Sequence, residues 1–168
     1  LVDAGFGLRV EELVPDLWGF TAEPKVGIGQ TALLARTPGG NLLFDVPPFV
    51  APEALRLIGE SGGVAAIMAS HPHMYGVQLE WAHAFGAPVW VSAKDRRWVR
   101  REGPEVREWD EPFDVLPGIR ALRFGGHFPG SAVTVWPAGA DGRGVLLTGD
   151  TIATVPAAQH TSIRPPSR

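Results

Sequence analysis

The sequence contains no cysteine. Disulfide bonds, thiolate metal ligands and a cysteine nucleophile are therefore all excluded. Any metal ion must be held by histidine, aspartate, glutamate or water. The first residues also lack a basic segment followed by an apolar one, which is the pattern of a secretory signal. We therefore expect a cytoplasmic protein, since a chain without cysteine fits a reducing compartment.

The sequence also lacks a basic excess and a long hydrophobic run. Fifteen Lys and Arg stand against 18 Asp and Glu, and this balance argues against a general nucleic-acid binder. No apolar segment approaches the ~20 residues that a membrane helix needs. The most charged segment, residues 94–114, would suit either a basic, aromatic patch for nucleic acid or a solvated helix and loop. Because its charges nearly cancel, we favour the second interpretation, and we expect neither nucleic acid nor a membrane as a partner.

Glycine and proline are frequent, and they separate short apolar runs. This pattern is typical of many short strands joined by tight turns. A chain of 168 residues can bury roughly 70% of the surface that it exposes when unfolded, so we expect residues 1–168 to form a single domain.

The clearest element pattern lies in the first hundred residues. A hairpin is predicted from strands at 31–36 and 41–45 around the turn at 37–40. Helices are predicted at 52–60 and 77–85, the second from an apolar stripe of Val77, Trp81, Ala84 and Phe85. Strands at 64–69 and 88–92 flank the second helix, which favours a parallel pairing. Further strands are predicted at 115–116, 119–124, 131–136 and 145–148, two more lie within 8–20, and the residues after Asp150 are expected to be a loop or an unfinished element.

Two histidines follow the apolar strand predicted at 64–69. His71 and His73 are two positions apart, so in an extended backbone their imidazoles point the same way. Converging imidazoles are the start of a metal site. His127 and Asp150 also follow predicted strands, each directly after a glycine that lets the backbone turn sharply.

These residues, in this order, resemble the metal-binding motifs of the metallo-β-lactamase-fold superfamily. The match consists of His71-x-His73, the Gly-Gly turn before His127, and the Thr-Gly pair before Asp150. It covers roughly residues 31–151. The resemblance implies an α/β fold built as a four-layer αββα sandwich, and a hydrolase of small-molecule esters, lactams, thioesters or phosphodiesters. It also implies that the three histidines bind a first metal, that Asp150 bridges to a second, and that Asp45 supports the metal loop.

The chain departs from the family pattern His-x-His-x-Asp-His at two positions. Tyr75 and Gly76 stand where the family has Asp and His, which help to bind the second metal. The phenol of tyrosine has a pKa near 10, and glycine offers no ligand. We therefore expect one divalent metal, zinc before iron or manganese, and no second one. The family's last histidine is also missing, since only His160 lies downstream and we do not assign it that role.

Three interpretations stay open. In the first, the protein is a metal-dependent hydrolase acting on an ester, thioester, lactone or phosphoester, with Asp150 orienting the attacking water and Tyr75 donating a hydrogen bond or merely filling space. In the second, it is a non-catalytic scaffold or small-molecule binder that has lost the second metal site. In the third, the C-terminal part of the domain is missing from this chain. Asp45 would either hold the His71 loop or cap its strand.

Overall fold

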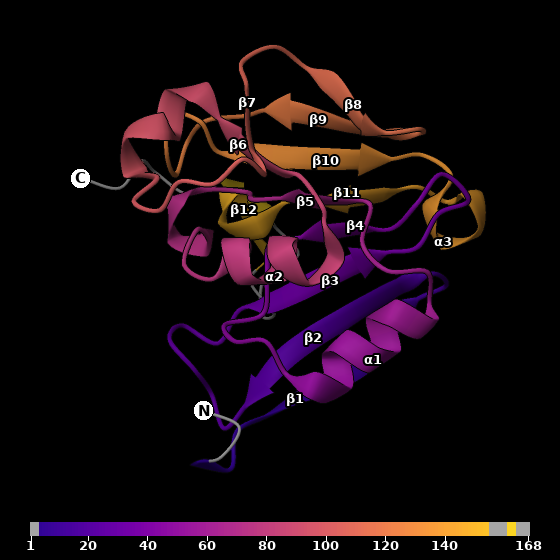
Figure 1. Cartoon of the computed structure of the whole chain (residues 1–168). Coiled ribbons are helices and arrows are strands. Elements are labelled where there is room, and N and C mark those ends of the chain that lie inside the picture. The colour runs from indigo at the N-terminus through magenta and orange to yellow at the C-terminus, as the bar shows by residue number, and fades with distance from the viewer. Residues whose placement is uncertain (1–3, 155–160, 164–168) are drawn as a thin grey trace.

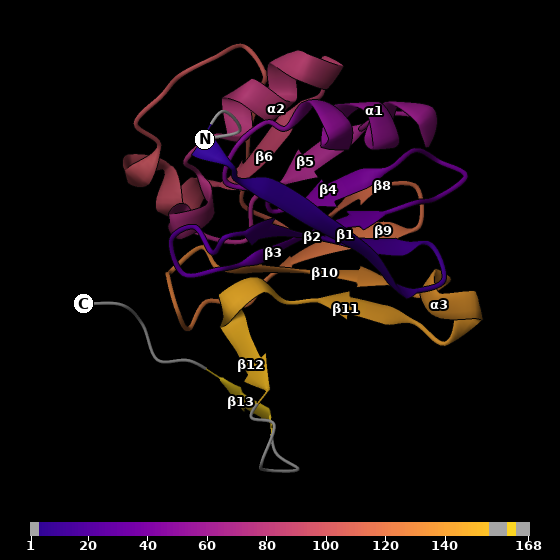
Figure 2. The same ribbon diagram turned by 90° about the horizontal axis from the view of Figure 1, so that it is seen from below.

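Two sheets face each other in the computed structural model, which describes residues 4–154 and 161–163. His160 lies outside the described residues. Helices cover the outer face of the larger sheet, and the smaller sheet lies against its other face (Figure 1). The turned view of Figure 2 shows these layers edge-on.

The larger sheet has seven strands in the order of the sequence. Its first four strands pair antiparallel, and the pairs from the fourth strand onward are parallel. The predicted hairpin and the predicted parallel pairing across the second helix are thus confirmed. The strands are β1 (Gly7–Val14), β2 (Leu17–Glu23), β3 (Thr31–Ala35), β4 (Leu42–Phe44), β5 (Ala66–Met68), β6 (Val89–Ser92) and β7 (Val106–Trp109).

Two helices pack on this sheet, α1 (Pro52–Glu60) and α2 (Gln78–Phe85). The bounds of α1 are those predicted, with proline in the first turn. The left-handed backbone of Gly86 ends α2. The predicted apolar stripe of α2 is partly wrong, because Ala84 is exposed. The residues that α2 buries are Gln78, Leu79, Trp81 and Ala82.

The smaller sheet is antiparallel and has the order β11-β10-β9-β8. Its strands lie close to where they were predicted. The segment after Asp150, expected to be a loop or an unfinished element, contains two short strands that pair antiparallel. The backbone of these strands pairs Ile152 with Ile163, and such β-branched residues favour strands. The elements are β8 (Phe113–Leu116), β9 (Ile119–Arg123), β10 (Ala132–Trp136), α3 (Gly139–Gly142), β11 (Val145–Leu147), η4 (Gly149–Thr151), β12 (Ile152–Thr154) and β13 (Thr161–Ile163).

The charged segment 94–114 also differs from expectation. It was predicted to be a helix and a loop, but it contains the short helix η3 (Ala93–Trp98), then β7, and then the start of β8. In β7 only Trp109 is buried, so the strand shows no regular apolar alternation. Its charges pair with one another: Arg96 contacts both Glu102 and Glu108.

Two apolar cores hold the layers together. One lies between the larger sheet and the helices, and it includes Phe20, Ile58 and Trp81. The other lies between the two sheets and includes Phe44 and Ile119. The predicted α/β fold with two facing sheets is therefore confirmed. No helix in the described part of the chain is long and apolar enough to cross a membrane.

Candidate metal centre

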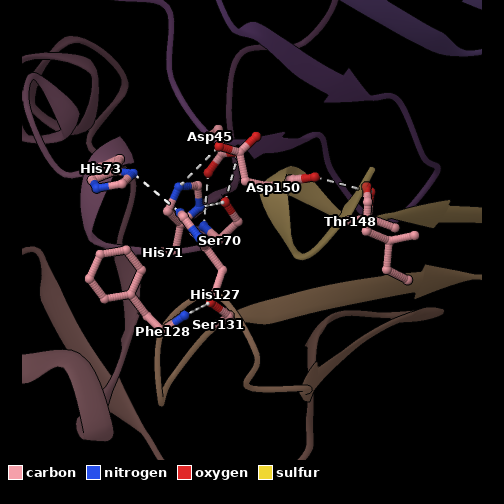
Figure 3. A network of polar contacts seen from close by, with 11 residues as sticks. Asp45, Ser70, His71, His73, His127, Phe128, Ser131, Thr148 and Asp150 are labelled. Carbon is pink, nitrogen blue, oxygen red and sulfur yellow. Dashed lines mark hydrogen bonds and ion pairs between the residues drawn. The ribbon is translucent and has the colours of Figure 1, made fainter. Parts of the chain in front are cut away.

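The structure brings His71, His73, His127 and Asp150 together. His71 follows β5, His73 lies in the short helix η2 (Pro72–Met74), His127 follows β9, and Asp150 lies in η4. Figure 3 shows the three imidazoles and the Asp150 carboxylate gathered at one point. One ligand atom from each residue lies within 4.8 Å of all the others. His71 is fully buried, whereas His73 is exposed, so the cluster lies at the surface end of the sheets.

The spacing of these atoms suits a tetrahedral ion. Ligands at about 2.0–2.1 Å from zinc in a tetrahedron are about 3.3 Å apart. His127 Nε2 and His73 Nδ1 are separated by 3.3 Å. His71 Nε2 faces the Asp150 carboxylate at 3.8 Å, so the carboxylate is slightly farther from its neighbour. Three imidazole nitrogens and one carboxylate could therefore hold one divalent metal ion.

A buried hydrogen-bond chain orients His71. The Asp45 carboxylate accepts hydrogen bonds from the backbone N–H of Ser70 at 2.8 Å and from its hydroxyl at 2.9 Å. The Ser70 hydroxyl has a single proton, which it gives to Asp45, so it accepts from Nδ1–H of His71 at 2.8 Å. This tautomer places the lone pair on Nε2, the nitrogen that faces the cluster. Asp45 thus acts on the His71 loop through Ser70, the first of the two roles expected for it.

The environment of Asp45 disfavours its charge. Burial raises the pKa of this carboxyl to about 7, against the lowering effect of the two Ser70 hydrogen bonds, and the charge of Asp150 raises it further. A cation at the cluster would counteract both effects. The pKa of Asp45 is therefore expected to fall when a metal binds.

Gly149 allows the loop of Asp150 to approach this hydrogen-bond chain. Its backbone has a φ of 50°, and a Cβ atom there would lie 2.4 Å from the Ser70 hydroxyl oxygen. Any side chain would displace Ser70, so only glycine fits between the two ligand loops.

The loop of His127 is held by two residues that the sequence analysis missed. The buried Asp95 carboxylate accepts a hydrogen bond from the N–H of Gly130 at 3.0 Å. Phe128 packs against all three imidazoles, with ring centroids 5.0 to 5.9 Å away. Phe128 and Ser70 directly adjoin predicted ligands, and that adjacency was their only signal. Asp95 was not recognised because it lies in the charged segment 94–114, which was interpreted as solvent-exposed.

Comparison with known proteins shows the same architecture in solved structures. DIM-1 metallo-β-lactamase, exposed to ceftazidime, superimposes with a TM-score of 0.69 at 14% identity, over 89% of this chain and 73% of that one. The chain has the metallo-β-lactamase fold. A Cronobacter sakazakii metallo-β-lactamase with a HARLDQ motif gives 0.62 at 19% identity, over 82% and 63% of the two chains. SMB-1 metallo-β-lactamase bound to mercaptoacetic acid also gives 0.62, at 18% identity, over 82% and 62%.

The sequence comparison found a relative whose name states no function. The chain is 42% identical over 137 residues to the uncharacterized protein YmaE of Bacillus subtilis (strain 168). The match covers 81% of this chain, and this chain spans only half the length of that relative. No protein-family model matches the sequence.

Tyr75 and Gly76, the two residues that depart from the superfamily pattern, lie in different surroundings. Tyr75 is buried in the core between the larger sheet and the helices. Burial, with the charges of Asp95 and Asp45, raises the pKa of its phenol above the ordinary value, so it stays protonated. Gly76 is exposed, and a Cβ atom there would meet nothing within 4 Å. Neither residue supplies a metal ligand.

His73 lines three cavities of the described structure, and two of them bear on the site. One has a volume of about 350 Å³ and opens beside the cluster. It is lined by Ile28, Gly29, Gln30, His73, His127 and Asp150. The other, of about 240 Å³, extends from His73 toward Trp98. A molecule bound in either cavity would have His73 as a neighbour.

Proposed function

We propose that this protein is a metal-dependent hydrolase with one divalent ion, preferably zinc. His71, His73 and His127 would hold this ion beside Asp150. The observation that carries the proposal is the convergence of four ligand atoms within 4.8 Å at the open end of two sheets. The metallo-β-lactamase fold supports it. The substrate class that we propose is a small ester, thioester, lactone or phosphoester.

The residues around the site have separate roles in the proposed reaction. A divalent ion in this place supplies Lewis acidity, which polarises a carbonyl or phosphoryl oxygen and lowers the pKa of water beside it. Asp150 is partly exposed and lines the cavity beside the cluster, so its carboxylate can orient a water molecule and take its proton. Ser70 and Asp45 hold His71 in the ligating tautomer. Phe128 covers the imidazoles on one side and limits access of solvent.

A second candidate is a metal-containing binder without catalytic activity. Tyr75 and Gly76 favour it, because neither can replace the Asp and His that the superfamily pattern has at these positions. Both candidates predict a bound metal, and only the first predicts turnover.

Activity measurements with matched histidine variants separate the two candidates. The full chain, loaded with zinc, iron or manganese, is assayed on p-nitrophenyl acetate, an acyl thioester, a γ-lactone and bis-p-nitrophenyl phosphate. The hydrolase should turn over at least one of these, and His71→Ala and His127→Ala should each abolish that activity. His83→Ala is the control, since His83 is exposed on α2 and pairs only with Glu105 at 3.3 Å in the described structure. A metal-loaded protein inactive on all four classes would favour the binder, and variants as active as the parent would refute the hydrolase.

A further inference from the structure

The histidine cluster is assembled from loops of two different sheets. His71 and His73 follow β5 of the larger sheet, whereas His127 follows β9 of the smaller one. Ligands of a metal ion must be held within about 0.5 Å of their working positions. The placement of the His127 loop relative to the other two histidines therefore decides how well the cluster binds an ion.

Residues 127–131, the His127 turn, form a closed unit. The hydroxyl of Ser131 accepts a hydrogen bond from the N–H of Phe128 at 2.8 Å (Figure 3). The N–H of Ser131 donates to the carbonyl of Phe128 at 3.1 Å. Directly after the turn, the N–H of Ala132 donates to the carbonyl of Ser70 at 2.8 Å. The turn thus has a fixed internal shape, and contacts from outside determine its position.

Asp95 provides such a contact from the side of the larger sheet. It lies in η3, just after β6, and Oδ1 of its buried carboxylate accepts a hydrogen bond from the N–H of Gly130 at 3.0 Å. Its Oδ2 has no hydrogen-bond partner in the described structure. A carboxylate is costly to bury, and the hydrogen bond that this one makes is to the His127 turn. Asp95 therefore connects η3 to the turn that carries His127.

The turn lies directly against the start of η3. A Cβ atom on Gly130 would lie 2.7 Å from Cγ of Asp95 and 2.5 Å from the hydroxyl oxygen of Ser92. These distances are well inside van der Waals contact, so any side chain at this position would push the turn away from Asp95. The backbone of Gly130 is not left-handed, so space alone requires glycine here. Ser92 only occupies space in this contact, because its hydroxyl makes no hydrogen bond in the described structure.

We propose that Asp95 is a positioning residue for the metal centre. Through the N–H of Gly130 it sets the place of His127 relative to His71 and His73. The imidazole centroid of His127 lies 4.7 Å from that of His71 and 5.1 Å from that of His73, and the Asp95 contact maintains these distances. The inference rests on the proposed metal centre, and it assigns to Asp95 a role in metal affinity that its distance from the ligands in the sequence conceals.

Zinc titrations on matched variants of the full chain test this role. Asp95→Asn keeps an oxygen that can accept the Gly130 N–H, so its zinc affinity should stay within about threefold of the parent. Asp95→Leu has a similar size but no acceptor, and it should bind zinc about tenfold more weakly, as expected for a lost hydrogen bond to a charged group. Gly130→Ala should also weaken zinc binding, because its Cβ displaces the turn. Gly59→Ala is the control, since a Cβ at this position on α1 would meet nothing within 4 Å.

NMR on the metal-free protein gives a second readout that needs neither metal nor turnover. Nuclear Overhauser effects between the imidazole protons of His127 and those of His71 and His73 should be present in the parent and in Asp95→Asn. They should be weaker in Asp95→Leu, in a spectrum that otherwise shows a folded protein. A general loss of stability would not produce this difference.

Three results would overturn the inference. The first is an Asp95→Leu variant with the zinc affinity of the parent. The second is an equal loss of affinity in Asp95→Asn and Asp95→Leu, because the charge of Asp95 and not its hydrogen bond would then be the cause. The third is unchanged imidazole contacts in metal-free Asp95→Leu. If the parent itself binds no zinc, the proposed function fails, and the imidazole contacts alone decide whether Asp95 positions His127.

Discussion

Replacing Ser70 with alanine tests how the chain prepares His71 for a metal. The Ser70 hydroxyl joins Asp45 and His71, at 2.9 and 2.8 Å, and all three side chains are buried. Ser70→Ala removes both hydrogen bonds but keeps the backbone hydrogen bond to Asp45 at 2.8 Å. The substitution therefore affects the orientation of the imidazole and leaves the path of the loop unchanged.

The size of the effect follows from these contacts. Without the hydroxyl, Nδ1–H of His71 loses its acceptor, and a buried donor left unpaired costs about 1–3 kcal/mol. The imidazole is then free to take the other tautomer, which turns its lone pair away from the cluster. Loss of such a supporting residue typically weakens metal binding about 10–100-fold. We therefore expect Ser70→Ala to bind zinc about 10–100-fold more weakly than the parent. We also expect its metal-free form to be less stable than that of the parent.

A competition titration with a zinc chelator measures the affinity, and urea denaturation measures the stability. Ser92→Ala is the matched control, because Ser92 is also a buried serine, and its hydroxyl has no hydrogen-bond partner in the described structure. Its removal should leave zinc affinity unchanged and should not lower stability, because no hydrogen bond is lost. Zinc affinity in Ser70→Ala equal to that of the parent would refute the role assigned to the Asp45–Ser70–His71 chain.

Two further substitutions have expected outcomes. Gly149→Ala should reduce zinc affinity and cost at least about 1–2 kcal/mol of stability, since its Cβ would lie 2.4 Å from the Ser70 oxygen on a left-handed backbone; unchanged unfolding and zinc titrations would contradict this. Burial raises the pKa of Asp95 above the ordinary value, with the Gly130 N–H and the Arg97 charge opposing this, so the unfolded chain loses the Asp95 proton at a lower pH than the folded protein. Stability should therefore decrease as pH rises through the window between those two pKa values, and Asp95→Asn should remove this part of the slope in urea titrations from pH 4 to 7. An identical slope in the variant would show that Asp95 is not the cause.

Local sequence signals were sufficient for much of the fold. Proline at the first turn and paired glycines after the last turn set both ends of α1. Turn residues between two apolar runs set the β3–β4 hairpin. The ligand residues could be found because each lies within a few residues of a strand end, and their type and order are visible in the sequence alone.

The remaining features depend on contacts between distant segments. β7 was missed because only Trp109 of that strand is buried, so its pairing with β6 leaves no apolar alternation. The face of α2 was misjudged because Gln78 is buried despite its polarity. Asp95 holds a loop 35 residues away, and no local pattern indicates that contact. Ser70 and Phe128 acquire their roles only when the loops meet.

A crystal structure of the zinc-loaded protein with anomalous data at the zinc edge tests the central claim most directly. We predict one anomalous peak per chain, bound by His71 Nε2, His73 Nδ1 and His127 Nε2, with Asp150 next to it. Asp45 and Ser70 should keep their hydrogen bonds to the His71 loop. No peak at the three histidines, or a second peak of equal height beside Tyr75 and Gly76, would contradict the single-metal centre.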